Sequence, residues 1–280
     1  MCVNNIFGGR MNDKIPIRFF VITFLWSWMI LVPTAVLSKI GILEIDINNL
    51  LIALPISFIG ALGPAAGAFF SLYTLNGKGA IKEYCKKFIS LKFGWKAWIS
   101  MFAILGGAYF AAWIIPEFFG ENRVSPFIPI YIFPIYLLLM IFMGGGQEEI
   151  GWRGYILPFL EKKYGLIIGS LILGIIWAIW HIPLWFIPGT TQAYMNFIAF
   201  TFMTIGYSYI FSWIREISNN KLFSGLFVHG IANGFAVIFP TLVMDKNANQ
   251  IRFWIYTVII LIIGIIIVSI RTYKSRKTST

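Results

Sequence analysis

Residues 253–270 read FWIYTVIILIIGIIIVSI and contain no charged side chain. A helix needs about 20 predominantly apolar residues to cross a hydrocarbon layer of roughly 30 Å. Further apolar runs of comparable length occur along the whole chain before this one. The predicted spans lie near 17–38, 50–75, 97–116, 127–147, 165–187, 192–214, 222–243 and 253–270. The predicted fold is therefore all-α, a polytopic membrane bundle of about eight transmembrane helices.

The composition agrees with a chain whose main solvent is lipid. Hydrophobic residues make up 59% of the 280 residues, charged residues only 12%, and the mean hydropathy is +0.80. A soluble globular domain carries roughly 25% charged residues. The first run is followed by no convincing cleavage site with small residues, so we expect it to remain as a membrane anchor. An ordinary soluble domain is thereby excluded.

The basic residues are distributed unevenly between the predicted loops. If the N-terminus is cytoplasmic, 18 of the 22 Lys and Arg residues fall on the cytoplasmic side of the predicted spans. Such an asymmetry is typical of the positive-inside rule. We therefore predict that both termini are cytoplasmic and that the protein is a multi-pass protein of the cell (cytoplasmic) membrane. The net charge of +11 is interpreted as contact with anionic lipid headgroups, with no role in binding nucleic acid.

The chain shows no linker, low-complexity tract or repeat. We predict a short cytoplasmic N-terminal segment at 1–16, a single membrane domain at 17–270 and a basic cytoplasmic tail at 271–280. Translation starting at Met11 instead of Met1 is left open. Cys2 and Cys85 both fall on the predicted cytoplasmic side, where thiols stay reduced, so no disulfide framework is expected.

One polar stretch interrupts the apolar pattern. Residues 144–155 read GGGQEEIGWRGY and are followed by further apolar residues up to Leu160, after which come the charged residues 161–163 and Gly165. We expect helix to continue after the glycines and to end at Gly165, because charges and a glycine mark helix C-termini. The carboxylates of Glu148 and Glu149 would then lie inside the bundle, and an antiparallel hairpin would bring Glu148 level with His181.

Ionisable side chains inside a membrane protein are costly and mark functional sites by default. The chain has two histidines, His181 and His229, and both lie in apolar helix-forming sequence. As structural residues they would serve as interhelical hydrogen-bond donors. Two histidines together with Glu148, Glu149 and nearby polar residues favour a reactive site over that role.

The spacing of these residues predicts two pairs. Glu149 and Arg153 are four residues apart, share a helix face and can form an ion pair. Glu148 is rotated by about 100° and stays free to face a cavity. His229 and Asn233 are also four apart, so they project together as two donors suited to stabilising an oxyanion.

A carboxylate among apolar helices takes up a proton more readily than one in water. Glu148 could therefore act as a general base on a water molecule, with His181 holding or polarising that water. The rival chemistry is a zinc site made of Glu148, His181 and His229 with one open position. We expect no cofactor, and zinc is the alternative that is not favoured.

Other intramembrane protease chemistries lack their residues. The aspartates Asp13, Asp46 and Asp245 all lie in predicted loops, and no HExxH zinc motif is present. No cysteine lies in a predicted span. Ser208 and Ser224 are isolated serines, and no serine stands in a Gly-x-Ser-x-Gly elbow. These absences leave the glutamate and the zinc chemistries.

The polar motifs resemble those of the CPBP family, the CAAX-protease and bacteriocin-processing (Abi-like) group of intramembrane peptidases. The marks of that family are EExxxR, an aromatic residue with His four positions later, and HxxxN. Here they read Glu148 to Arg153, Trp177 to His181, and His229 to Asn233. They are spread over about 127–240, whereas the preceding helices carry no motif.

The resemblance implies an eight-helix bundle with a cavity open toward the cytoplasm. It implies that Glu148 and His181 activate a water molecule and that His229 and Asn233 stabilise the oxyanion. Glu149, Arg153 and the aromatic residue, Trp177 here, have supporting roles. Eukaryotic relatives remove the last three residues of prenylated proteins, and prokaryotic members resemble processors of peptides or bacteriocin-immunity proteins. Members are often classed as metallopeptidases.

The leading hypothesis is a glutamate-type intramembrane endopeptidase that acts on a membrane-associated or lipidated peptide or protein. A non-enzymatic bacteriocin-immunity or scaffold membrane protein is the alternative from another class. A small transporter is less favoured, because paired repeats or matched broken helices are not visible. The sequence selects neither the peptide nor the oligomeric state.

Overall fold

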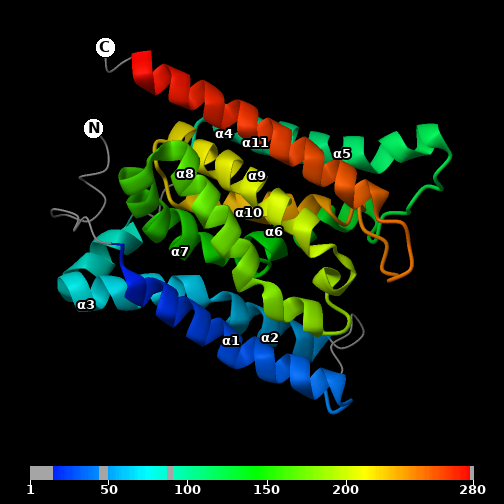
Figure 1. The fold of residues 1–280 in the computed structure, drawn as a ribbon, viewed down its shortest axis with the longest axis horizontal. Helices are drawn as coiled ribbons and strands as arrows, with labels where there is room; N and C mark the ends of the chain where they lie inside the picture. The colour runs from blue at the N-terminus through cyan, green and yellow to red at the C-terminus, as the bar shows by residue number, and fades with distance from the viewer. Residues whose placement is uncertain (1–14, 44–49, 87–90, 278–280) are drawn as a thin grey trace.

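A computed structural model describes residues 15–43, 50–86 and 91–277. Those residues form helices and connecting turns without a strand, so the all-α prediction is confirmed (Figure 1). The α-helices are α1 (Ile17–Lys39), α2 (Leu50–Ala61), α3 (Gly63–Lys86), α4 (Trp95–Met101), α5 (Gly107–Ile114), α6 (Phe133–Met143), α7 (Glu149–Gly151), α8 (Leu157–Trp180), α9 (Phe197–Ile217), α10 (Phe223–Phe235) and α11 (Ile251–Lys277).

Several helical stretches are long and apolar enough to cross a membrane, as expected for a multi-pass protein. Six occur within the described ranges: Ile17–Lys39, Ile52–Lys86, Trp95–Phe119, Ile130–Phe186, Phe197–Ile217 and Ile251–Ser275. The count of eight stays a prediction, because two regions differ from simple spans.

The first difference is at the predicted runs 127–147 and 165–187, which both overlap the single stretch Ile130–Phe186. This stretch folds back at Gly165, whose φ of 80° is non-helical. A Cβ added at Gly169 would lie 2.7 Å from the backbone nitrogen of Glu161, so the two arms pack closely. The predicted hairpin is therefore present, and Gly165 is its turn.

The second difference is at the predicted run 222–243. Its helix, α10, has only 13 residues and ends at Phe235. The chain then forms turns up to Pro240. The α10 helix is therefore shorter than a full span.

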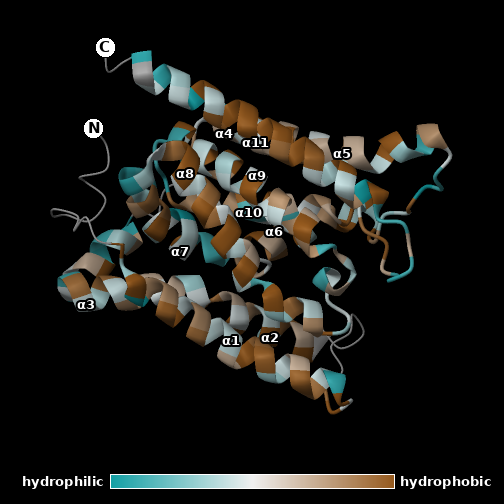
Figure 2. Cartoon of the chain, in the orientation of Figure 1, coloured by the Kyte–Doolittle hydropathy of each residue, from teal (hydrophilic) through white to brown (hydrophobic). Residues whose placement is uncertain are grey.

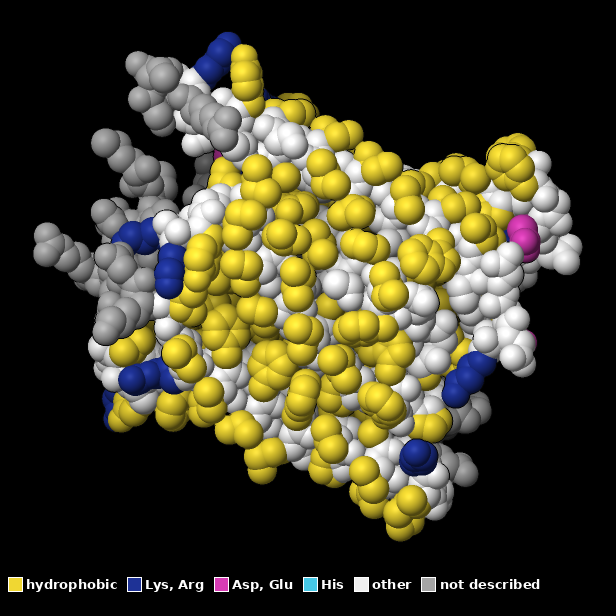
Figure 3. Space-filling view, in the orientation of Figure 1, with side chains coloured by type: hydrophobic (Ala, Val, Ile, Leu, Met, Phe, Trp, Pro, Cys, Tyr) yellow, Lys and Arg dark blue, Asp and Glu magenta, His cyan; other side chains and the backbone are white. Residues whose placement is uncertain are grey.

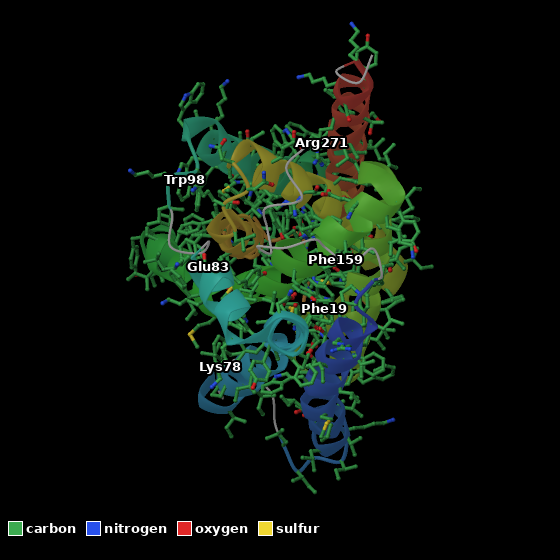
Figure 4. All side chains as sticks on the ribbon, turned by 90° about the vertical axis from the view of Figure 1, so that its left-hand side faces the viewer. Phe19, Lys78, Glu83, Trp98, Phe159 and Arg271 are labelled. Carbon is green, nitrogen blue, oxygen red and sulfur yellow. The ribbon has the colours of Figure 1, made fainter. Side chains whose placement is uncertain are left out.

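The first residue of α1 and the last residue of α11 lie at the same end of the bundle, on the left in Figure 1. Lys and Arg side chains gather at this end in Figure 3, and Figure 4 looks onto it, with Lys78 and Arg271 labelled. That both termini lie on one side of the membrane, and that this side is the cytoplasm, stay predictions.

The flanks of the bundle expose large apolar side chains, which form the broad hydrophobic surface in Figure 3. Met29 and Ile135 are each 73% exposed. A soluble monomer rarely exposes a continuous apolar surface of this extent. The flanks therefore suit contact with lipid tails.

Helix α9 lies at the centre and packs against α8, α10 and α11 (Figure 1). Small residues allow its close contact with α11: a Cβ at Gly206 would lie 2.8 Å from the backbone of Ile260, and one at Gly264 would lie 2.8 Å from the Gly206 carbonyl oxygen. Such small-residue contacts bring membrane helices together. The α9 side chains are thereby placed against α8 and α10.

Some predicted features lie outside the described residues: Met1, Cys2, Met11, Asp13, Asp46, most of the N-terminal segment 1–16 and the last three residues of the tail. Within the described ranges, α11 continues to Lys277, so the predicted tail begins as helix. Cys85 is a free, exposed cysteine.

Candidate active site

The candidate site begins where α6 ends. Gly144 follows the helix, Gly145 has a left-handed φ of 113°, and a 3₁₀ turn covers Gly146–Glu148. Helix then continues through α7 and a π-helical segment, Trp152–Ile156, into α8. The structure agrees with the prediction of helix after the glycines, although that helix is not a regular α-helix. Figure 2 shows this hydrophilic region around α7, which packs against α3 and α10.

Glu149 joins two other members of the predicted set. Its Oε1 accepts a hydrogen bond from Nη1 of Arg153 at 2.8 Å and one from Nδ1 of His229 at 2.9 Å. All three side chains are buried. The structure therefore contains the predicted Glu149–Arg153 pair. It also adds a contact that the sequence did not indicate, because the same carboxylate orients His229.

Glu148 is buried beside Trp177, whose Nε1–H donates to Oε2 of Glu148 at 2.9 Å. The Glu148 carboxylate, which was predicted to stay free, thus has a hydrogen-bond partner. The Trp177 ring centroid lies 5.8 Å from that of His181 and 5.2 Å from that of His229. The Arg153 guanidinium lies over the same ring at 4.4 Å. Trp177 therefore brings Glu148 and both histidines together.

His181 follows the last residue of α8. Its Nδ1 lies 2.8 Å from the backbone carbonyl oxygen of Trp177. A carbonyl oxygen can only accept a hydrogen bond, so Nδ1 carries the hydrogen of the neutral ring and Nε2 keeps its lone pair. His181 is therefore prepared to bind a hydrogen-bond donor, such as water, through Nε2.

His229 and Asn233 converge on Gly145, in agreement with the prediction from their four-residue spacing. A Cβ at Gly145 would lie 2.5 Å from Nε2 of His229 and 3.0 Å from Nδ2 of Asn233. Only glycine leaves room there. The Asn233 amide donates to the Gly144 carbonyl oxygen at 2.6 Å, which uses one of its two hydrogens and ties α10 to the end of α6.

A metal centre was the rival interpretation. Both imidazoles place Nδ1 against an oxygen, the usual second contact of metal-binding histidines. However, no group of three or more His, Cys, Asp or Glu side chains within the described ranges is arranged to hold a metal ion. Glu148, His181 and His229 are neighbours through Trp177 and do not form such a ligand group.

Several polar contacts of the site were missed at the sequence level. Ser208 accepts from Nη2 of Arg153 at 3.1 Å, and Nη1 of Arg215 donates to the Arg153 carbonyl oxygen at 3.1 Å. The feature of the sequence that could have indicated these contacts is a row of buried polar residues on α9: Thr204, Ser208, Ser212 and Arg215. Helical spacing places those residues on one face, so the apolar run 192–214 did carry a readable pattern.

The fold and the site together define a multi-pass helical membrane protein with a buried Glu–His constellation. Residues 129–235 match the family model described as "Type II CAAX prenyl endopeptidase Rce1-like". Glu148, Glu149, Arg153, Trp177, His181, His229 and Asn233 all lie within the matched range. This match supports a domain of the CPBP (CAAX-protease) family over that part of the chain.

A curated relative agrees with this assignment. The chain is 33% identical over 73 residues to CAAX prenyl protease 2 of Methanococcus maripaludis. The aligned part covers 26% of this chain and 24% of that protein. The alignment thus spans about a quarter of the relative's length.

Proposed function

We propose that the protein is an intramembrane endopeptidase of the glutamate type. It hydrolyses a peptide bond in a membrane-associated or lipidated peptide or protein. The observation that carries the proposal is the meeting of Glu148, His181 and His229 around Trp177, inside the bundle. The name of the archaeal relative, a CAAX prenyl protease, supports a prenylated substrate.

Glu148 is the general base. The Trp177 N–H holds Oε2, and Oε1 takes a proton from the attacking water. Glu148 then returns this proton to the amine nitrogen as the oxyanion collapses and the peptide C–N bond breaks. His181 holds that water through Nε2, because its Nδ1–H is engaged by the Trp177 carbonyl. A positioned base typically contributes about 10²–10⁴-fold to the rate of such a step.

His229 and Asn233 stabilise the oxyanion that forms when water attacks the peptide carbonyl. His229 donates through Nε2 only as an imidazolium, because Nδ1–H points at Glu149. The Glu149 carboxylate stabilises that positive charge, and Arg153 holds the carboxylate. The second amide hydrogen of Asn233 is the other donor. Preorganised donors of this kind are each worth about 10²–10³-fold in kcat.

The proposed reaction needs no cofactor, since a carboxylate base can deprotonate water without a metal. Its proposed location is the cytoplasmic membrane, with the active site reached from the cytoplasmic side. The partners are the peptide or lipidated substrate and the surrounding lipids.

The test uses the full chain in phospholipid vesicles with a prenylated fluorogenic peptide. Glu148→Ala should lower kcat by about 10³-fold or more if it removes the base. Glu216→Gln is the matched control, because Glu216 lies on α9 and pairs with Arg271 outside the proposed machinery.

Full activity of Glu148→Ala would refute the proposal. If the wild-type protein cleaves nothing while cells keep a phenotype that Glu148→Gln also preserves, the non-enzymatic alternative is favoured.

A further inference from the structure

The π-helical segment Trp152–Ile156 leaves one backbone carbonyl without a helical donor. The Leu157 N–H bonds to the Trp152 carbonyl, five residues earlier. If the next hydrogen bond also joined residues five apart, the Arg153 carbonyl would accept from the N–H of residue 158. That residue is Pro158, which has none. The unpaired carbonyl therefore belongs to the residue whose side chain holds Glu149.

Arg215 of α9 supplies the missing donor. Its Nη1 lies 3.1 Å from the Arg153 carbonyl oxygen, and its Nη2 bonds Oε2 of Glu161 at 2.8 Å. Glu161 of α8 also accepts from Ser212. Because Arg215 is only 8% exposed, its bonds are shielded from competing water. A buried polar group left unpaired is costly, so this donor stabilises the turn.

A second contact holds α7, directly before the π-helical segment, and comes from α3. The Tyr84 hydroxyl of α3 donates to the Ile150 carbonyl oxygen. Gly154 makes this approach possible, because a Cβ there would lie 2.2 Å from the Tyr84 oxygen. The turn that carries Glu149 and Arg153 is therefore held between α3 and α9.

We infer that Arg215 is a positioning residue for the peptidase. Arg215 donates to the Arg153 carbonyl and so holds the π turn in place. The π turn places the Arg153 side chain against Glu149, and Glu149 in turn orients His229. One residue more or less in a helical turn rotates the following side chains by about 100°. The π turn lies between Glu148 and Trp177, so its loss would separate them. This inference rests on the proposed function and extends it to a residue outside the motifs.

The first test measures kcat and KM for Arg215→Ala. We expect kcat to fall about tenfold and KM to change less than about threefold, because the variant disturbs groups needed in the transition state. The control is Arg252→Ala. Arg252 is also buried and donates to two backbone carbonyls, those of Trp113 and Asn122, in a part of the bundle remote from the site. It should lower thermal stability and leave kcat within about twofold.

A rescue variant separates positioning from general damage. Pro158→Ala restores an N–H that can bond the Arg153 carbonyl from within the helix. In the Arg215→Ala background it should recover kcat to within about threefold of the wild type, since the two changes affect one shared acceptor. Failure of this rescue, or equal loss of kcat in Arg252→Ala, would overturn the inference.

Hydrogen–deuterium exchange provides a readout that does not depend on catalysis. Arg215→Ala should raise exchange over residues 146–160, Pro158→Ala should restore protection, and Arg252→Ala should leave this segment unchanged. If wild-type protein cleaves no peptide, the proposed function fails, and the exchange data still decide the structural role of Arg215. Unchanged exchange in Arg215→Ala would overturn that role.

Discussion

Trp177 donates its indole N–H to Oε2 of Glu148 at 2.9 Å. The backbone carbonyl of the same tryptophan accepts from His181 at 2.8 Å. The two residues proposed to activate water are therefore fixed by one residue, whose ring also carries the Arg153 guanidinium. The aromatic position of the family motif has a polar function in this chain that a phenylalanine could not perform.

Trp177→Phe tests that function. The variant keeps the ring and the backbone carbonyl but removes the donor to Glu148, so kcat should fall about tenfold, in line with the loss of a hydrogen bond to a charged group. Trp185→Phe is the control, because Trp185 donates to the Met195 carbonyl away from Glu148. The measurement is kcat on a prenylated peptide. Wild-type kcat in Trp177→Phe would mean that the indole N–H has no part in positioning the base.

Gly145→Ala should abolish cleavage. The new Cβ would stand 2.5 Å from Nε2 of His229, and the φ of 113° is unfavourable for alanine. Gly120→Ala shares the positive φ, at 88°, but meets nothing within 4 Å. We expect loss of kcat by about 10²-fold or more for Gly145→Ala only, because a displaced donor no longer stabilises the oxyanion. Similar kcat values for both variants would show that close packing at Gly145 is irrelevant.

The buried Glu149–Arg153 pair predicts a pattern of stability. Removing one partner leaves the other charge uncompensated, so Glu149→Gln should destabilise the fold by about 3–5 kcal/mol. Replacing both partners, as in Glu149→Gln with Arg153→Met, should restore part of that loss while leaving the enzyme inactive. Thermal unfolding in detergent is the measurement. A double variant less stable than Glu149→Gln alone would contradict this account.

Spacing within one helix was sufficient to predict the local pairs. Glu149 with Arg153, and His229 with Asn233, follow from the four-residue repeat of a helix. Contacts between helices were not predictable in this way. The bond from His229 to Glu149 spans 80 residues, and it depends on how α10 packs beside α7.

The π turn was hidden for a related reason. It becomes visible only when the donor of each backbone carbonyl is identified, and an apolar pattern does not identify those donors. The length of α10 was overestimated for the opposite reason: hydropathy extends to residue 243, whereas the helix ends at Phe235. Apolar character predicts burial or lipid contact more reliably than it predicts helix length.

Chelation tests the proposed absence of a cofactor. Incubating active protein with a strong chelator and removing the chelator by gel filtration should leave kcat within about twofold of its starting value, since the proposed base is a carboxylate. A zinc peptidase with an HExxH motif, assayed in the same vesicles, is the positive control for metal removal. Stoichiometric zinc in the active protein, together with loss of activity on chelation, would reverse this expectation in favour of the zinc site considered above.

Cys85 offers a test of orientation. It is exposed near the end of α3, two residues after Glu83, which Figure 4 labels on the bundle end that faces the viewer. In a Cys2→Ser background, a membrane-impermeant maleimide should label Cys85 in inside-out vesicles and leave it unlabelled in intact cells. Lys246→Cys combined with Cys85→Ser should give the opposite result, because residue 246 lies in an exposed loop on the predicted outer side. Labelling of Cys85 in intact cells would invert the predicted topology and place the proposed active site within reach of extracellular peptides.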